Sequence, residues 1–164
     1  ARDAAVSKAT LYSHFRNKDD LFLGVCSRMA HLLQRAFADA LAVPQQTLDE
    51  RVLSALLAKH RLTYTLVRSS PHAEELFSHK AQLAGDLFAH ADGVMLQRLT
   101  EALGQDSSLR PSAPRLARAL FLGTGELAAR SSSVQELESD LTAFVAVHLA
   151  GARALAPTDA AKHR

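Results

Sequence analysis

Apolar side chains recur at helical spacing along almost the whole chain. Leu21, Val25 and Met29 are four residues apart, and Leu137 and Leu141 repeat this spacing near the other end. Such spacing places apolar residues on one face of an α-helix. The alternation of β-branched and aromatic residues that is typical of strands does not occur. The sequence therefore predicts an all-α fold.

Only seven glycines and five prolines interrupt this pattern, and several of them mark expected helix ends. Asn17 and Ser133 are expected N-caps, because their side chains accept bonds from the free amides of a first helical turn. Gly104 is an expected helix end, and Pro44 and Pro157 stop the helices before them. The predicted helices span residues 7–15, 18–43, 48–67, 72–79, 80–103, 114–130 and 134–156.

The composition excludes several classes of protein. A chain of 164 residues buries enough surface to need no disulfide or structural metal, and its single cysteine, Cys26, forms no disulfide framework. No run of about 18 apolar residues exists, so no membrane span is expected. No signal peptide opens the chain, so a cytoplasmic location is predicted. The 19 basic and 17 acidic residues nearly balance, so a nucleic-acid site would be a local patch.

The chain contains none of the motifs that mark common catalytic sites. G-x-S-x-G, H-E-x-x-H, a P-loop and a dinucleotide-binding fingerprint are all absent from the sequence, so neither enzymatic activity nor a cofactor is predicted. The spacing of His72, Glu75 and His79 would place them on one helix face, where such residues bind zinc in some proteins. A solvated helix face is the favoured interpretation, so no metal site is predicted.

The first 22 residues differ from the rest of the chain. They read as a helix end, a turn, a short helix capped by Ser7, a second turn and the start of a long helix. This is the layout of a helix-turn-helix motif, whose second helix enters the major groove of DNA. Between residues 7 and 18, Lys8, Arg16 and Lys18 are basic and no residue is acidic. Residues 7–18, called the basic segment below, are therefore predicted to form a local DNA-binding surface.

Residues 6–22, VSKATLYSHFRNKDDLF, closely resemble the DNA-binding sequence of TetR-type transcriptional regulators. Ala5 departs from the family, which often has glycine in this turn. The family also has a helix and the first half of the motif before this point, so an N-terminal segment is expected to be missing and the chain as written is expected to bind DNA poorly. The resemblance implies DNA contacts by Ser7, Lys8, Ala9, Thr10, Tyr12, His14 and Lys18.

The resemblance also implies two regions with different tasks. Residues 1–42 are expected to be an incomplete helix-turn-helix region with its connecting helix, and residues 44–164 an effector-binding and dimerisation domain. The implied function is that of a ligand-responsive repressor, which binds a pseudo-palindromic operator in double-stranded DNA as a homodimer and is released by a small-molecule effector. Two alternatives remain: a helical interaction module that does not bind DNA, and an enzyme on a helical scaffold.

Inward-facing aromatic, sulfur-containing and polar residues are the candidates for the effector pocket, because pockets combine apolar walls with a few polar groups. His60 and Tyr64, four residues apart on one apolar stripe, form the best polar pair. Each candidate also has the plainer interpretation of an ordinary core residue. The pocket candidates are Met29, Leu33, Phe37, His60, Tyr64, Phe88, Met95 and Phe121.

The last two predicted helices carry the candidate dimer interface. Small residues in the first of them permit close approach, and an apolar ridge runs along the second. Two such helices from each copy would form a four-helix bundle about a twofold axis. The alternative is that both helices pack only on their own core. The interface candidates are Gly123, Thr124, Ala128, Leu137, Leu141, Phe144, His148 and Ala152.

Overall fold

The computed structural model describes residues 15–68 and 73–156, including all of their side chains except those of 67, 68 and 73–83. Within these ranges the chain forms five α-helices and one short 3-10 helix, and it contains no strand. The predicted all-α fold is confirmed. The elements are α2 (Lys18–Leu41), α3 (Leu48–Arg68), α4 (Ala73–Leu103), η1 (Arg110–Ser112), α5 (Ala113–Arg130) and α6 (Val134–Ala154).

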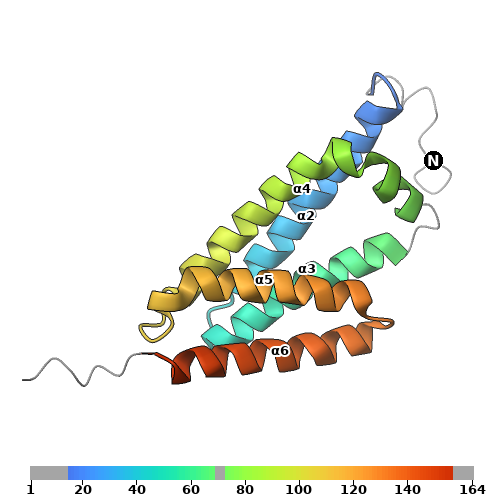
Figure 1. Cartoon of the computed structure of the whole chain (residues 1–164). Coiled ribbons are helices and arrows are strands. Elements are labelled where there is room, and N and C mark those ends of the chain that lie inside the picture. The colour runs from blue at the N-terminus through green and yellow to red at the C-terminus, as the bar shows by residue number, and fades with distance from the viewer. Residues whose placement is uncertain (1–14, 69–72, 157–164) are drawn as a thin grey trace, which may run out of the picture.

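The helices form two groups that share one core. Helices α2 and α4 lie side by side as a diagonal pair, and α5 lies beside α6 (Figure 1). Helix α3 contacts α2, α4, α5 and α6, so it holds the two groups together. The start of α2 lies at the end of the molecule that is most distant from the end of α6 (Figure 1).

Side-chain caps fix the starts of three helices. The Asp20 amide donates to Oδ1 of Asn17 at 2.8 Å, as the sequence predicts for the start of α2. The Glu136 amide donates to Oγ of Ser133 at 3.1 Å, which confirms the predicted cap of α6. At α3, the Thr47 amide donates to Oε2 of Glu50 at 2.7 Å. Each cap satisfies amides that the helix itself leaves without partners.

The described core is built mainly from aliphatic side chains of all five helices. Burying one Leu or Phe side chain contributes roughly 1.5–3 kcal/mol, so these residues dominate the stability of the fold. Helix α2 contributes a full stripe to this core, from Cys26 to Leu41. The largest side chains that are less than 2% exposed are Phe37, Leu56, Met95, Leu99, Leu103, Leu109, Leu120, Leu137, Leu141, Leu149, Val52 and Val145.

Helix α4 differs from the prediction. Two helices were expected, over residues 72–79 and 80–103, but the structure has one continuous helix, Ala73–Leu103. Its first turns, dark green in Figure 1, run in a different direction from the rest of the helix. Residues 79–82 are His, Lys, Ala and Gln, and none of them is a strong helix breaker. The helix therefore continues across the predicted boundary between residues 79 and 80.

One arginine joins three segments at the end of the molecule where α6 ends. The Arg153 guanidinium donates from Nη1 to Oδ2 of Asp49 at 2.7 Å and from Nε to Oδ2 of Asp106 at 3.1 Å. Asp49 lies in the first turn of α3, and Asp106 follows α4. The Ser108 hydroxyl, and secondarily Arg153, hold the pKa of Asp106 at about 2. These contacts fix the ends of α3, α4 and α6 relative to one another.

Candidate functional site

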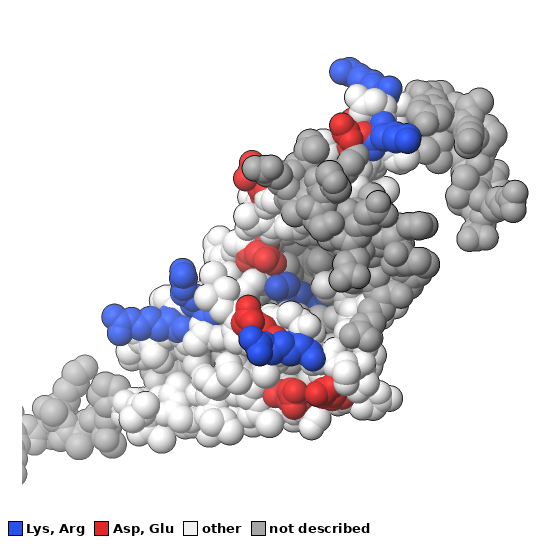
Figure 2. Space-filling view, turned by 45° about the vertical axis from the view of Figure 1, so that its right-hand side comes forward, with Lys and Arg blue, Asp and Glu red and all other residues white. Residues whose placement is uncertain are grey.

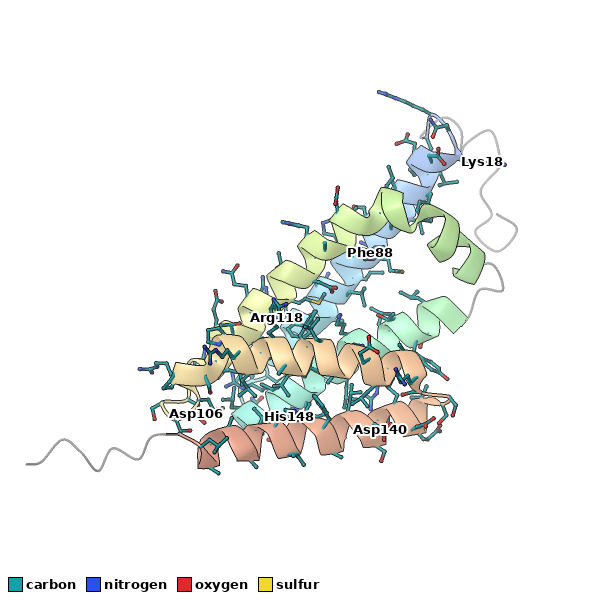
Figure 3. The ribbon with its side chains drawn as sticks, viewed as in Figure 1. Lys18, Phe88, Asp106, Arg118, Asp140 and His148 are labelled. Atoms are coloured by element: carbon teal, nitrogen blue, oxygen red, sulfur yellow. The ribbon has the colours of Figure 1, made fainter. Side chains whose placement is uncertain are left out.

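Lys18 is the one predicted DNA-contacting residue that lies within the described part of the chain. It is the first residue of α2, is exposed, and points away from the helical core (Figure 3). Basic and acidic side chains lie side by side at this end of the molecule (Figure 2). The other six candidates, which lie outside the described residues, are Ser7, Lys8, Ala9, Thr10, Tyr12 and His14.

A close contact joins the end of the basic segment to α2. A Cβ atom added to Gly24 would lie 2.7 Å from Cε1 of Phe15, so the Phe15 ring sits directly on the glycine. Just beyond Phe15, the Arg16 amide donates to Oδ2 of Asp20 at 3.0 Å. The chain that leads from the basic segment is therefore held against the first turns of α2. No sequence pattern marks Gly24, because its contact depends on a turn whose geometry the sequence does not fix.

Six of the eight pocket candidates lie in or against one apolar cluster. Leu33, Phe37, Met95 and Phe121 are buried in the cluster, and Met29 and Phe88 pack against it. The rings of Phe37 and Phe121 meet edge to face with their centroids 6.5 Å apart. These residues come from α2, α4 and α5, so the predicted set is brought together in space.

His60 is the buried polar member of the predicted pocket set. Its Nε2 lies 3.1 Å from Oγ1 of Thr124, which itself donates to the Leu120 carbonyl oxygen at 2.7 Å. Because a threonine hydroxyl has only one proton, His60 is the donor in the bond to Thr124. Burial, and secondarily Lys59, lowers the pKa of His60 to about 3. The imidazole is therefore neutral near pH 7, and Nε2 carries its proton.

Tyr64 lies one helical turn beyond His60 but has a different partner. Its hydroxyl donates to the carbonyl oxygen of Ser132 at 3.0 Å, in the connection between α5 and α6. The side chain is only partly buried. The two residues of the predicted polar pair thus share a face of α3, while one bonds to α5 and the other to the loop that follows it.

Lys59 is a site residue that the sequence analysis does not identify. Its Nζ lies 3.8 Å from the centroid of the Phe121 ring and 3.3 Å from Oδ1 of Asp92, and its side chain is 12% exposed. Burial lowers the pKa of Lys59, and the carboxylate of Asp92 opposes that shift. The lysine joins α3 to α4 and α5. A lone lysine within an apolar helix has no sequence pattern that would predict these contacts.

The dimer candidates divide into residues that face the chain's own core and residues near its surface. Thr124, Leu137 and Leu141 are completely buried within one chain, so they have no surface to offer to a second copy. Phe144 packs over Gly123, where an added Cβ would overlap its ring. The His148 ring lies 3.9 Å from that of Phe144, centroid to centroid. Gly123, Ala128, Phe144, His148 and Ala152 are partly exposed.

The same two helices expose other apolar side chains. Leu122 on α5 is 56% exposed and Val147 on α6 is 68% exposed. Small apolar residues of α6 surround Val147 on the exposed face, and they are Ala143, Ala146, Ala150 and Gly151. The ridge predicted on α6 includes Leu137 and Leu141 of the buried face, because both faces of this helix are apolar.

The described residues show neither a membrane-spanning helix nor a metal-binding cluster. None of their helices is both long enough and apolar enough to cross a membrane. They contain no group of three or more His, Cys, Asp or Glu residues that could hold a metal ion. The side chains of His72, Glu75 and His79 lie outside the described set.

The comparison with known families gives one match. Residues 1–25 match the family model described as bacterial regulatory proteins, tetR family. No curated protein and no solved structure matches the chain. The matched residues include the whole basic segment and the first turns of α2.

Proposed function

Since its N-terminal residues are those of a TetR-family transcriptional regulator, we propose that this chain is a DNA-binding repressor released from its operator by a small-molecule effector. The observation that carries the proposal is the family match over residues 1–25, which continues directly into the helix that packs in the core. The proposed division is a DNA-binding region with its connecting helix over residues 1–42, and an effector and dimerisation region over 44–164. The proposed place of action is the cytoplasm.

The proposed DNA contacts lie on the short helix predicted over residues 7–15 and at the start of α2. Lys18 is exposed at the first turn of α2, where its ammonium group can contact a phosphate of the DNA backbone. Phosphate contacts set orientation, while contacts with base edges set sequence preference. The proposed contacts are Ser7, Lys8, Ala9, Thr10, Tyr12, His14 and Lys18.

The proposed homodimer uses the exposed apolar face of α5 and α6. Leu122 and Val147 are more than half exposed, and small residues around Val147 permit close approach of a second helix pair. A twofold axis between the copies would present two motifs in opposite orientation. The proposed operator is therefore pseudo-palindromic, with one half-site for each copy.

The proposed effector site lies around the cluster of Phe37, Phe121 and Met95, beside Lys59 and His60. Lys59 supplies a positive charge next to the Phe121 ring. His60, the next residue of α3, supplies an imidazole whose tautomer is fixed by its bond to Thr124. These polar groups give an apolar site the means to orient a ligand. Release requires only that the effector binds better to the conformation with lower DNA affinity.

The first test is a fluorescence-anisotropy titration of the full-length protein against the DNA upstream of its own gene. We expect tight, sequence-specific binding that weakens steeply with salt. Lys18→Ala should weaken binding to all sequences and reduce the salt slope by about 1, because one phosphate contact is lost. Tyr12→Phe should also weaken binding. Arg115→Ala, an exposed change on α5, is the control and should bind like the parent.

The outcomes of this titration separate the alternatives. Parent-like binding by both Lys18→Ala and Tyr12→Phe would show that the contact residues are wrongly assigned. Absence of specific binding by the full-length protein would contradict the proposal and favour a helical interaction module without DNA binding.

A further inference from the structure

A basic groove lies between the outer faces of α2 and α4. Its volume is about 590 Å³, and its lining includes Arg28, His31 and Arg35 from α2 and Arg98 from α4. On α2, this face is turned away from the stripe that enters the core, which includes Leu33 and Phe37. The groove is therefore separate from the proposed effector site.

The arginines of the groove carry more positive charge than the surrounding groups neutralise. Among the described residues, neither Arg28 nor Arg98 forms an ion pair or a side-chain hydrogen bond. Nε of Arg35 lies 3.6 Å from Oδ2 of Asp39, the acidic residue that lines the groove. Both side chains are more than 70% exposed. An exposed pair of this kind is weak, so all three guanidinium groups are accessible to an anion.

Apart from these charged residues, the groove is lined by Gln34 and by apolar side chains. Leu32 is 36% exposed and lines the groove together with Val94 and Ala38. A planar guanidinium group donates two parallel hydrogen bonds to a phosphate or carboxylate. Apolar walls beside such donors suit a molecule with an anionic head and an apolar body. The volume lies in the range of small-molecule sites, which is roughly 300–1,000 Å³.

We propose that this groove binds a small organic anion, whose phosphate or carboxylate group bridges arginines of α2 and α4. Among the described residues, Arg28 and Arg98 have no other partner, so they are the arginines proposed to hold the anionic group, while Leu32 and Val94 contact the apolar body. The proposal depends neither on DNA binding nor on the proposed effector site.

The test measures the melting temperature of the protein with phenyl phosphate as the probe. Sodium chloride at matched ionic strength, inorganic phosphate and benzyl alcohol are the comparison additives. We expect phenyl phosphate at about ten times its Kd to raise the melting temperature by roughly 3 °C or more, because it binds only the folded chain. Inorganic phosphate should act more weakly because it lacks the apolar contacts, and benzyl alcohol should have no effect.

Two double variants locate the effect. Arg28→Gln with Arg98→Gln should remove the response to phenyl phosphate, and it should fold normally because both side chains are exposed. Arg115→Gln with Arg118→Gln removes the same charge from the exposed surface of α5 and should keep the response. Equal responses in both double variants, or an equal response to sodium chloride, would overturn the proposal. Because no DNA is present, these results leave the proposed repressor function untouched.

Discussion

Two neighbouring side chains of α3 place polar groups in an otherwise apolar core. Lys59 contacts Asp92 and the Phe121 ring, while His60 donates to Thr124. Each contact joins α3 to another helix, so these residues set the packing of the core as well as its polarity. Burying these polar groups costs free energy, and single contacts with their partners offset that cost. The stability of the fold therefore depends on these contacts.

His60 gives the stability of the fold a dependence on pH. Its pKa is about 3 in the folded chain against an ordinary value of 6.5, so only the unfolded chain takes up the proton between these values. The free energy of unfolding should therefore fall as the pH drops below 6.5, by up to about 1.4 kcal/mol per pH unit, and should not depend on this group above it.

Urea unfolding between pH 5 and 8 measures this effect. His60→Gln retains a donor for Thr124 and has no proton to gain, so the slope below pH 6.5 should decrease. Asp106 changes the free energy of unfolding only below its ordinary pKa of 3.8, which lies outside the measured pH range. His90→Gln, an exposed change on α4, is the control. A slope that survives in His60→Gln and disappears in the control would contradict the assignment.

Gly24 provides a test of the contact between the basic segment and α2. Gly24→Ala places a methyl group 2.7 Å from Cε1 of Phe15, so the ring must move. We expect weaker operator binding, at a local packing cost of about 1–3 kcal/mol, with the helical core retained. Anisotropy titration and circular dichroism of the full-length protein measure these two effects.

Gly93→Ala is the matched control for this change. Nothing lies within 4 Å of a Cβ at Gly93, which is exposed on α4. Alanine in a helix interior should raise stability there by roughly 0.5–1 kcal/mol. Unchanged DNA binding in Gly24→Ala would mean that the position of Phe15 has no influence on the DNA contacts.

At the scale of whole elements, α6 has two apolar faces with different surroundings. Leu137, Leu141, Val145 and Leu149 are buried within the chain, while Val147 and its small neighbours are exposed. The inward stripe stabilises the fold of one chain. The outward face, together with Leu122 of α5, is the surface that the proposed dimer would cover.

Charges on the outward face should therefore separate the copies. The double variant Leu122→Glu with Val147→Glu should elute as a folded monomer in size-exclusion chromatography with light scattering. Leu155→Glu, which changes a residue that is 86% exposed just beyond α6, is the control and should leave the assembly unchanged. In contrast, Leu141→Glu should unfold the chain, since Leu141 is completely buried. A dimeric double variant would move the interface to another surface.

Helix boundaries were accessible from sequence because local groups determine them. Asn17 and Ser133 cap helices through bonds to residues three positions ahead, and α4 ends immediately before Gly104. The apolar stripes likewise identify most of the core. In α6, however, periodicity alone does not distinguish the face that packs on the same chain from the face left exposed. Leu137 and Leu141, which were predicted for the dimer interface, lie on the face that is buried within the chain.

At the scale of the molecule, contacts between distant residues had no local pattern to reveal them. Lys59 meets Phe121 and Asp92, and Arg153 meets residues 47 and 104 positions earlier. The basic groove combines arginines from α2 and α4 that lie far apart in the sequence. The contacts of Lys59 and Arg153 and the basic groove all depend on how the helices pack against one another. The family resemblance could be read from residues 6–22, and the match over residues 1–25 agrees with it.

The Arg153 contacts also fix the end of the molecule that is opposite to the proposed DNA contact. They hold α3 just after the turn that follows α2, while Lys18 begins α2 at the opposite end. Helix α2 has 24 residues, and at 1.5 Å per residue it is a lever arm about 36 Å long. A tilt of about 5° around the fixed end would move Lys18 by about 3 Å. A small rearrangement in the core would thus become a displacement as large as a hydrogen-bond length at the proposed DNA contact.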